Sequence, residues 1–426
     1  MQKGKMIAAI DVGTEKVTTV IASESLEHKK INVMGVSATP SKGIRKSQIV
    51  DIEEATESIT ESVEAAERMA GYSITQAIVA IDGAHISSQN SKGVVAVADP
   101  DGEITSEDVE RVIEAARAVS LPSAREIIHV VPRNFTVDSQ EGIKDPVGMS
   151  GVRLEADAHL ITASSTAIRN LTKCINEIGA DVTRLVFGGL AASESVLTET
   201  EKELGVVLVD IGAGTTSLVV FVEGNLTHTS VLPIGARNIT NDLAIGMRIS
   251  SESAEKIKRF LSKGEIAKIG DGKEKKEDEI ELVKLELKEE IKTASRKTLV
   301  EGIIKPRLHE IFSMIGIELK KSGVAGQTPA GLVITGGGAE TIGLSDAAKR
   351  SLSMPTRIGN PTGLSGLVDE IESPAYAVAS GLVLYASRKV PEGKTGFGGG
   401  LRAVTERLPG KGIAVKIVDF VKSFLP

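Results

Sequence analysis

Two Asp-x-Gly turns are the parts of this sequence that are best suited to chemistry. Asp11 and Gly13 follow one apolar run of residues, and Asp210 and Gly212 follow another. Glycine lets the backbone approach a phosphate group closely, and exposed backbone amides donate hydrogen bonds to the phosphate oxygens. An aspartate beside each turn is suited to hold the water shell of a Mg²⁺ ion that bridges two phosphates. The two turns together predict a clamp for the phosphates of a nucleotide.

A third glycine turn and several threonines extend the predicted site. The run at 336–338 closes an apolar strand and is expected to open a helix, a position that suits an α-phosphate or a ribose. Any one of these turns alone is more simply a tight hairpin, whereas all three in this order favour a phosphate site. The predicted binding residues at the turns are Asp11, Gly13, Thr14, Lys16, Asp210, Gly212, Gly214, Thr215, Thr216, Gly336, Gly337 and Gly338, with Mg²⁺ at Asp11 and Asp210.

Two other nucleotide-binding motifs are excluded by the residues themselves. Gly393, Lys394 and Thr395 resemble the end of a Walker A loop, but Arg388 stands where its first glycine would have to be. The first strand is not followed by Gly-x-Gly-x-x-Gly, so a Rossmann dinucleotide site is not expected.

The elements around the two Asp-x-Gly turns are repeated. Residues 6–21 and 206–222 each contain an apolar strand, the turn and a second apolar strand, which is the pattern of a β-hairpin. Asp11 and Asp210 lie 199 positions apart, too far for a solenoid repeat and typical of duplicated domains. Because strands and helices alternate around them, we expect two related α/β halves in this chain of 426 residues.

Residues 84–162 differ from the repeated halves. A strand-like run precedes the turn 99–102, and a helix capped at Thr105 or Ser106 follows it. A second apolar run and a polar loop come next, so we expect a small α+β domain inserted into the first half. The stretch 264–290 is rich in Lys and Glu, and residues 272–279 within it are interpreted as a solvated turn or disordered loop.

The C-terminal segment differs from the rest of the chain in charge and composition. Residues 388–426 contain eight basic and three acidic residues and carry +5, which leaves −12 on the remainder of a chain with net charge −7. Glycine and proline predict a linker at 388–410, and apolar residues at helical spacing predict an amphipathic helix at 411–426. A tethered basic helix suits the surface of an anionic membrane; the alternative is a terminal helix docked on its own core. The predicted membrane residues are Ile413, Lys416, Ile417, Phe420, Val421, Phe424 and Leu425.

Composition argues against several other classes of protein. A net charge of −7 disfavours a nucleic-acid binder, so no nucleic-acid partner is expected. Cys174 is the single cysteine, which fits a reducing compartment, and the six histidines lack zinc-ligand spacing. No apolar run is long enough to cross a membrane, and residues 1–10 do not resemble a signal peptide.

The three phosphate loops are the pattern of the superfamily of actin, DnaK chaperones and sugar kinases, and further segments carry a closer resemblance. These segments are 145–154, which contains Gly-Met-Ser-Gly-Val-Arg-Leu, and 186–192, 201–212, 300–307, 356–359 and 373–381. Over essentially its full length the chain resembles the FtsA family of bacterial cell-division proteins. The resemblance implies an actin-like (ribonuclease H-like) α/β fold, in which duplicated domains flank a nucleotide cleft, with an FtsA-type inserted subdomain and a C-terminal amphipathic helix.

The resemblance also implies a division into subdomains, of which IA and IIA carry the phosphate loops. The implied boundaries are 1–83, 163–195 and 363–387 for subdomain IA, 84–162 for the inserted subdomain IC, 196–245 and 331–362 for IIA, 246–330 for IIB, 388–410 for the flexible linker and 411–426 for the membrane-targeting helix.

Further site residues follow from the resemblance alone. It implies that the ligand is ATP, with Glu255 on the ribose and Lys258 beside the adenine; without it, the two residues indicate a surface ion pair. DnaK-type relatives carry Glu-Pro where this chain has Gly188 and Gly189. No carboxylate is therefore evident to activate water, and we expect slow or absent ATP hydrolysis.

A partner site and a function are also implied. The family's peptide-binding region maps near residues 300–311, where Arg307 and Glu310 form an exposed-looking i,i+3 pair; an ordinary surface ion pair is the alternative. The implied function is to tether filaments of tubulin-like FtsZ to the membrane during bacterial cell division. The implied partners are the FtsZ C-terminal peptide, further copies of the chain in a filament, anionic lipid and other division proteins. The implied location is peripheral, on the cytoplasmic face of the membrane at the division site.

Two other functions remain open for a chain of this fold. One is a PilM-like scaffold of pilus assembly, and the other is an enzyme or chaperone ATPase. A DnaK-type chaperone would need a substrate-binding β-domain, for which no length is left after residue 388, and a sugar kinase would lack the C-terminal helix. The tail and the segment at 145–154 favour the FtsA-like function.

Overall fold

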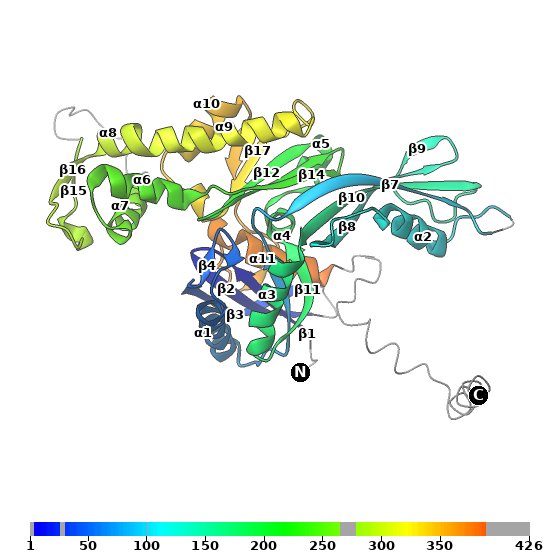
Figure 1. The fold of residues 1–426 in the computed structure, drawn as a ribbon, viewed down its shortest axis with the longest axis horizontal. Helices are drawn as coiled ribbons and strands as arrows, with labels where there is room; N and C mark the ends of the chain where they lie inside the picture. The colour runs from blue at the N-terminus through cyan, green and yellow to red at the C-terminus, as the bar shows by residue number, and fades with distance from the viewer. Residues whose placement is uncertain (1–3, 26–29, 100, 265–277, 389–426) are drawn as a thin grey trace, which may run out of the picture. The chain divides into compact units, whose positions relative to one another are not determined.

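A computed structural model describes residues 4–25, 30–99, 101–264 and 278–388 (Figure 1). The predicted linker beyond residue 388 and the predicted membrane helix at 411–426 lie outside these residues. Within the described part of the chain, no helix combines the length and the apolar character that crossing a bilayer requires.

The first half of the fold is built on a six-stranded sheet. β1 and β2 form an antiparallel hairpin that β3 continues, while β6 pairs in parallel with β1, and β11 with β6. The strands are β1 (Lys5–Val12), β2 (Lys16–Glu24), β3 (Ile31–Pro40), β6 (Gln76–Ile81), β11 (Asp181–Phe187) and β19 (Ser365–Gly366). Helices α1 (Ile52–Ala70) and α3 (Ser165–Glu177) pack together on this sheet, as do α4 (Gly188–Val196) and α11 (Ala377–Ser387). Because helices pack on the sheet, its strands are buried, which explains why their sequences are continuous apolar runs.

The second half repeats this arrangement around a five-stranded sheet. Its order β14-β13-β12-β17-β18 matches the order β3-β2-β1-β6-β11 of the first sheet, with an antiparallel meander followed by two parallel strands. The strands are β12 (Val206–Ile211), β13 (Thr216–Val222), β14 (Asn225–Leu232), β17 (Leu332–Thr335) and β18 (Thr356–Ile358). One apolar core includes the first sheet and part of the second sheet, and another includes alternate residues of the second sheet together with α6, α7, α9 and α10. The predicted duplication of α/β halves is confirmed.

Most of residues 236–352 lie in helices, and the short helix α5 precedes them in the second half. α9 follows a short α8 and a single π-helical segment at Val300–Ile304, and it packs against α10 and α6. The elements of this part are α5 (Glu199–Leu204), α6 (Ala236–Met247), α7 (Ser251–Gly264), β15 (Glu279–Glu281), β16 (Thr293–Ser295), α8 (Arg296–Leu299), α9 (Lys305–Lys321) and α10 (Leu344–Leu352).

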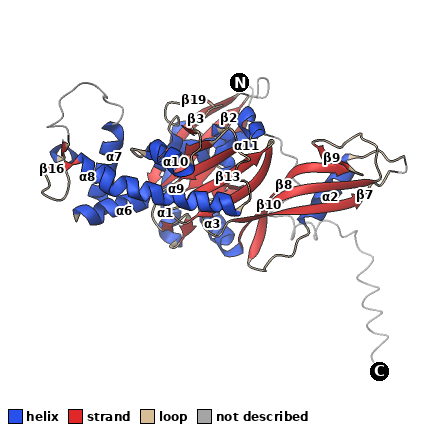
Figure 2. Cartoon of the chain, turned by 90° about the horizontal axis from the view of Figure 1, so that it is seen from above, coloured by secondary structure: helices blue, strands red, loops and turns tan. Residues whose placement is uncertain are grey.

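An α+β unit is inserted between β6 and α3, as predicted. Its sheet has the order β7-β10-β8-β9, and α2 packs on it (Figures 1 and 2). Thr105 caps α2, and its side chain and that of Asp108 form a reciprocal capping box, which confirms the predicted start of this helix. The elements are β7 (Ser87–Ala96), α2 (Ser106–Arg117), β8 (Arg125–Val137), β9 (Gln140–Ile143) and β10 (Arg153–Ser164).

The inserted unit contacts the second sheet through buried polar groups. His159 on β10 is 1 % exposed, and its Nδ1 lies 2.6 Å from Asn90 Oδ1 while its Nε2 lies 3.1 Å from Thr229 Oγ1 on β14. Ser88 Oγ donates to Thr229 O at 2.7 Å in the same contact. Burial lowers the pKa of His159 to about 3, and the charges of His228, Arg133 and His129 add to this effect.

His159 makes this contact sensitive to acid. The unfolded chain protonates the imidazole below its ordinary pKa of 6.5, whereas the folded chain keeps it neutral until about 3, so stability is lost as the pH falls through this range. His159→Gln should remove this contribution, which amounts to at most about 2 kcal/mol between pH 7.5 and pH 5. The difference in free energy of unfolding between wild type and variant, measured at both pH values, tests this. A difference that does not change with pH would contradict it.

Candidate functional site

The turns of the two hairpins line one cleft of about 1130 Å³. The amide of Gly13 donates to Lys16 O at 3.1 Å in the first turn, and that of Gly212 donates to Thr215 O at 2.9 Å in the second. Both predicted hairpins are thus confirmed. The predicted site residues that line the cleft are Asp11, Gly13, Thr14, Lys16, Asp210, Gly212, Thr215, Glu255, Lys258, Gly336, Gly337 and Gly338.

Two predicted site residues, Gly214 and Thr216, do not line the cleft. Thr216 is fully buried, and its hydroxyl donates to Ile234 O at 2.8 Å. A Cβ at Gly214 would lie 2.8 Å from Thr14 Oγ1, so glycine here lets the second turn approach the first. These two residues support the turns and do not face a ligand.

The third glycine turn packs directly against Asp210. Gly336 has φ +82°, and a Cβ there would lie 2.2 Å from Asp210 Oδ1, so only glycine fits. The turn opens only a single 3-10 turn, Gly337–Glu340. The expectation of an α-helix here is wrong, because α10 begins only at Leu344. Three successive glycines disfavour an α-helix for entropic reasons.

The carboxylates of the two turns have little positive charge near them. Burial raises the pKa of Asp11 to about 6, although the charge of Lys16 opposes the shift. Burial and the charge of Asp11 raise the pKa of Asp210 to about 7. Burial lowers the pKa of Lys16 to about 8 against the charges of Asp11 and Glu340, and its Nζ lies 3.5 Å from the centroid of the Tyr376 ring. The site would therefore gain stability from a bound cation.

A hydrated Mg²⁺ ion fits this set of oxygen donors. In the described residues no three acidic, histidine or cysteine side chains converge closely enough to hold a metal ion by themselves. Mg²⁺ keeps several of its waters and commonly binds through one or two carboxylates together with phosphate oxygens. Asp11 and Asp210 supply the carboxylates, and a phosphate ligand at the turns would supply the rest.

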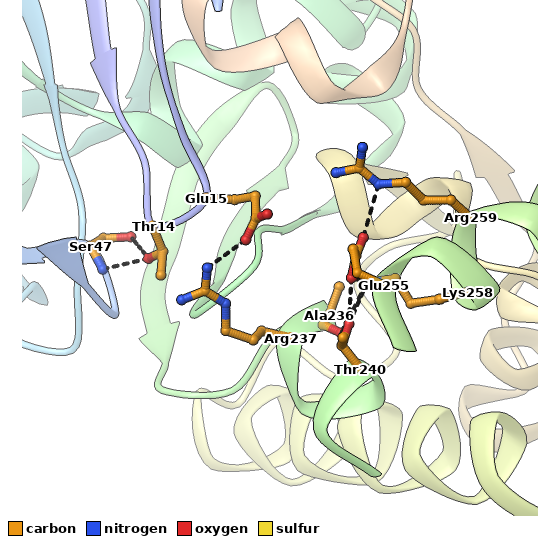
Figure 3. A network of polar contacts seen from close by, with 9 residues as sticks. All are labelled: Thr14, Glu15, Ser47, Ala236, Arg237, Thr240, Glu255, Lys258 and Arg259. Carbon is orange, nitrogen blue, oxygen red and sulfur yellow. Dashed lines mark hydrogen bonds and ion pairs between the residues drawn. The ribbon is translucent and has the colours of Figure 1, made fainter. Parts of the chain in front are cut away.

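Ser47 joins the two turns, and sequence reasoning did not identify it. It lies in the tight turn between β4 (Ile44–Arg45) and β5 (Gln48–Ile49), where Lys46 and Ser47 have φ of 49° and 57°. Its amide donates to Thr14 Oγ1 at 2.8 Å (Figure 3). Its Oγ lies 3.1 Å from Thr215 Oγ1. No motif marks this serine, because its contacts depend on two residues far away in the chain.

Glu255 and Lys258 lie on the wall of the cleft formed by α7. Lys258 is only 8 % exposed, and its Nζ contacts Glu255 Oε2 at 2.7 Å and Thr240 Oγ1 at 2.8 Å (Figure 3). Although burial opposes it, the charge of Lys258 and the hydrogen bonds from Lys258, Thr240 and Arg259 hold the pKa of Glu255 below its ordinary value. The predicted ion pair is present, but it lies in the wall of the cleft with Lys258 buried and not on the open surface. Contact with an adenosine stays a prediction.

A further ion pair joins the first turn to the second half. Glu15, in the first turn, accepts a hydrogen bond from Arg237 of α6 at 2.5 Å (Figure 3). Both side chains line the cleft, and both are partly exposed.

Asp82 is a further carboxylate of the cleft, and sequence reasoning missed it as well. It follows β6 directly, and its Oδ1 accepts a hydrogen bond from Ser217 Oγ at 3.1 Å. Burial and the charges of Asp210 and Asp11 raise its pKa well above the ordinary value. A signal was present in the sequence: residues 77–82 form an apolar run that ends in Asp, as do the runs before Asp11 and Asp210.

The predicted peptide residues lie away from the cleft, on α9. Arg307 binds Asp242 of α6 through Nε at 2.5 Å and through NH2 at 2.8 Å, and it also contacts Glu310. The side chain of Glu310 is 53 % exposed, but that of Arg307 is only 23 % exposed. The expectation of an exposed Arg307 is wrong because α6 packs beside it; binding of a peptide here is untested.

Two family models match the chain. One, described as the SHS2 domain inserted in FtsA, matches residues 83–162, which include the inserted α+β unit. The other, described as cell division protein FtsA, matches residues 207–381. The fold expected from the sequence, with an FtsA-type insertion, is thus confirmed.

Solved structures share the fold at low sequence identity. The PilM-PilN complex of type IV pilus biogenesis contains a chain with a TM-score of 0.62 and 16 % identity, over 90 % of this chain and 98 % of that one. MreB5 of Spiroplasma citri bound to AMPPNP has a TM-score of 0.50 and 13 % identity, over 88 % of this chain and 94 % of that one. The actin-like fold is therefore established.

Curated relatives are much closer. Cell division protein FtsA of Pseudomonas aeruginosa is 37 % identical over 92 % of both chains. The FtsA protein of Bacillus subtilis is 38 % identical over 93 % of this chain and 87 % of that protein, and that of Escherichia coli K12 is 36 % identical over 89 % and 90 %. Identity at this level over nearly the whole length leads to one conclusion: the chain belongs to the FtsA family of cell division proteins.

Proposed function

We propose that the protein binds ATP with Mg²⁺ in the cleft between its two halves and tethers FtsZ filaments to the membrane during cell division. The observation that carries the nucleotide part is the pair of Asp-x-Gly turns that line one cleft together with Asp11 and Asp210. A protein of the same fold, MreB5, is described with bound AMPPNP. Family membership supports the part in cell division.

The residues of the cleft divide into three roles. The amides and hydroxyls of the two turns, including Thr14 and Thr215, hold the phosphates, as does the glycine run at 336–338. Asp11 and Asp210 hold the waters of Mg²⁺, which would supply positive charge beside these two buried carboxylates. Glu255 and Lys258 lie on α7 and line the same cleft, where they suit the polar edges of a ribose and an adenine.

Assembly and membrane attachment complete the proposal. We assign the subdomain boundaries expected from the sequence, with IC at 84–162 and IIB at 246–330, and expect the actin-like subunits to form head-to-tail filaments. The amphipathic helix at 411–426 binds anionic lipid, so that the protein is peripheral on the cytoplasmic face at the division site. A role as a PilM-like scaffold is not favoured, because the likeness to PilM is one of fold at 16 % identity.

The partner site is proposed on α9 near Arg307, with the C-terminal peptide of FtsZ as the ligand. An acidic peptide would accept charge-assisted hydrogen bonds from the guanidinium. Arg307→Gln should therefore weaken binding about tenfold, as measured by pull-down and by titration of the full-length protein with the peptide.

Asp242→Asn is the matched control, because it breaks the same ion pair from the other side. It should leave the affinity unchanged or raise it, since the guanidinium is then free for the peptide. Equal loss of affinity in both variants would show that the ion pair only holds α6 against α9, and would remove Arg307 from the peptide site.

A further inference from the structure

The side chain of Asp82 lies beside the first residue of helix α4. Strands β6 and β11 pair in parallel with Ile81 opposite Phe187, so Asp82 lies beside Gly188, the first residue of α4. A Cβ built on Gly188 would lie 1.9 Å from Asp82 Oδ2, so glycine at 188 leaves the space that this carboxylate fills. Sequence reasoning found no carboxylate at 188 or 189, and the structure supplies one from the neighbouring strand.

Three elements fix the orientation of this carboxylate. The side chain follows β6, its Oδ1 accepts from Ser217 on β13, and its Oδ2 lies against the N-terminus of α4. β6 belongs to the first half and β13 to the second, so the carboxylate lines the cleft where the two halves contact each other. A group held from three sides is preorganised for chemistry.

A small cavity beside the cleft offers room for one water molecule next to Asp82. Its volume is about 20 Å³, and its polar lining residues include Ser47, Asp82 and His85. Most of its other lining residues are apolar, and a cavity of this size with polar groups on part of its wall is sufficient for a single water. Ser47 also contacts Thr14 and Thr215, the threonines of the two turns, so the cavity adjoins the region assigned to the phosphates.

We propose that Asp82 is the general base of a slow ATP hydrolysis in this cleft; the proposal rests on the proposed binding of ATP. Asp82 accepts a proton from a water molecule as the water oxygen attacks the γ-phosphorus. The bond between that phosphorus and the β,γ-bridging oxygen breaks, its electron pair stays on the bridging oxygen, and the products are ADP and inorganic phosphate. The hydrogen bond from Ser217 and the contact with the start of α4 hold the carboxylate oxygens in place to accept this proton.

The alternative is that Asp82 only links β6, α4 and β13. Asp82→Asn separates the two roles, because the amide oxygen can still accept from the Gly188 amide and the amide nitrogen can donate to Ser217. A structural link would survive this change, whereas a general base would not. Asp108→Asn is the control, because Asp108 is a buried carboxylate of α2 in the inserted unit, where it accepts from Thr105 and Arg111.

The experiment measures three quantities in full-length protein: Mg²⁺-ATP affinity by calorimetry, phosphate release, and the melting temperature without nucleotide. Asp82→Asn should reduce phosphate release about 100-fold or more and leave the affinity within a few-fold. Its melting temperature should stay close to that of the wild type, because the amide keeps both contacts of the carboxyl group. Asp108→Asn should lower the melting temperature and leave phosphate release unchanged.

A relocated carboxylate gives a second test. Asp82→Gly combined with Gly188→Asp moves the acid to the adjacent backbone position, and Gly188 has no left-handed φ that would oppose a side chain. Recovery of phosphate release relative to Asp82→Gly alone supports the proposal. Phosphate release by Asp82→Asn at the wild-type rate, or no release by a wild type that binds ATP, would overturn it. Failure of the wild type to bind ATP would instead overturn the proposed function.

Discussion

Asp210→Ala is expected to reduce the affinity for ATP in the presence of Mg²⁺ by about 10–100-fold. Asp210 lies against Gly336 at the centre of the cleft, and burial and the charge of Asp11 raise its pKa to about 7. With Mg²⁺ bound, the ion neutralises the negative charge of the carboxylate, and the carboxylate orders the waters of the ion. Without Mg²⁺, the same carboxylate repels the phosphates, so the variant should bind ATP in EDTA as well as the wild type does, or better. Calorimetric titration with Mg²⁺ and with EDTA measures both effects.

The reversal between the two conditions distinguishes a metal site from a packing defect. A packing defect would lower the affinity in Mg²⁺ and in EDTA alike. Asp346→Ala is the control, because Asp346 also lines the cleft but is exposed at the start of α10. It should not change the dependence on Mg²⁺. An unchanged affinity of Asp210→Ala in Mg²⁺ would remove Asp210 from the site.

Removal of the C-terminal segment is expected to abolish binding to anionic vesicles. In a helix at 411–426, apolar side chains such as Phe420 would enter the boundary of the acyl chains, each contributing up to about 1.5–3 kcal/mol when fully buried. Lys416 and Lys422 would each add about 1 kcal/mol near an anionic leaflet. So short a helix would fold only on contact with lipid, so we expect one copy to bind weakly and a filament with many copies to bind tightly.

Vesicle co-sedimentation of three variants tests the tail. A chain ending at Gly410 and the variant Phe420→Glu should both remain in the supernatant while ATP binding persists. Ser423→Glu is the matched control, because it adds the same charge on the polar face of the predicted helix and should weaken binding about tenfold or less. Full retention of binding by the chain ending at Gly410 would show that the tail is a helix docked on its own core.

Some features of this protein were determined by the sequence alone because their causes are local. A strand that ends in Asp-x-Gly and continues as a second strand forms a hairpin through contacts within the same short segment. The start of α2 depends on Thr105 and Asp108, which are three residues apart. The repetition of the Asp-x-Gly hairpin about 200 residues later indicated the duplicated fold before any long-range contact was known.

The tertiary structure alone decided which distant residues complete the site. Asp82 becomes part of the cleft because β6 pairs between β1 and β11, and Ser47 because a turn with two left-handed residues reaches Thr14 and Thr215. Arg307 is partly buried because it pairs with Asp242, which lies 65 residues earlier on α6. Strand order and helix packing bring such residues together, and neither depends on sequence spacing. Burial then sets the pKa of each carboxylate, because it depends on everything that surrounds the group.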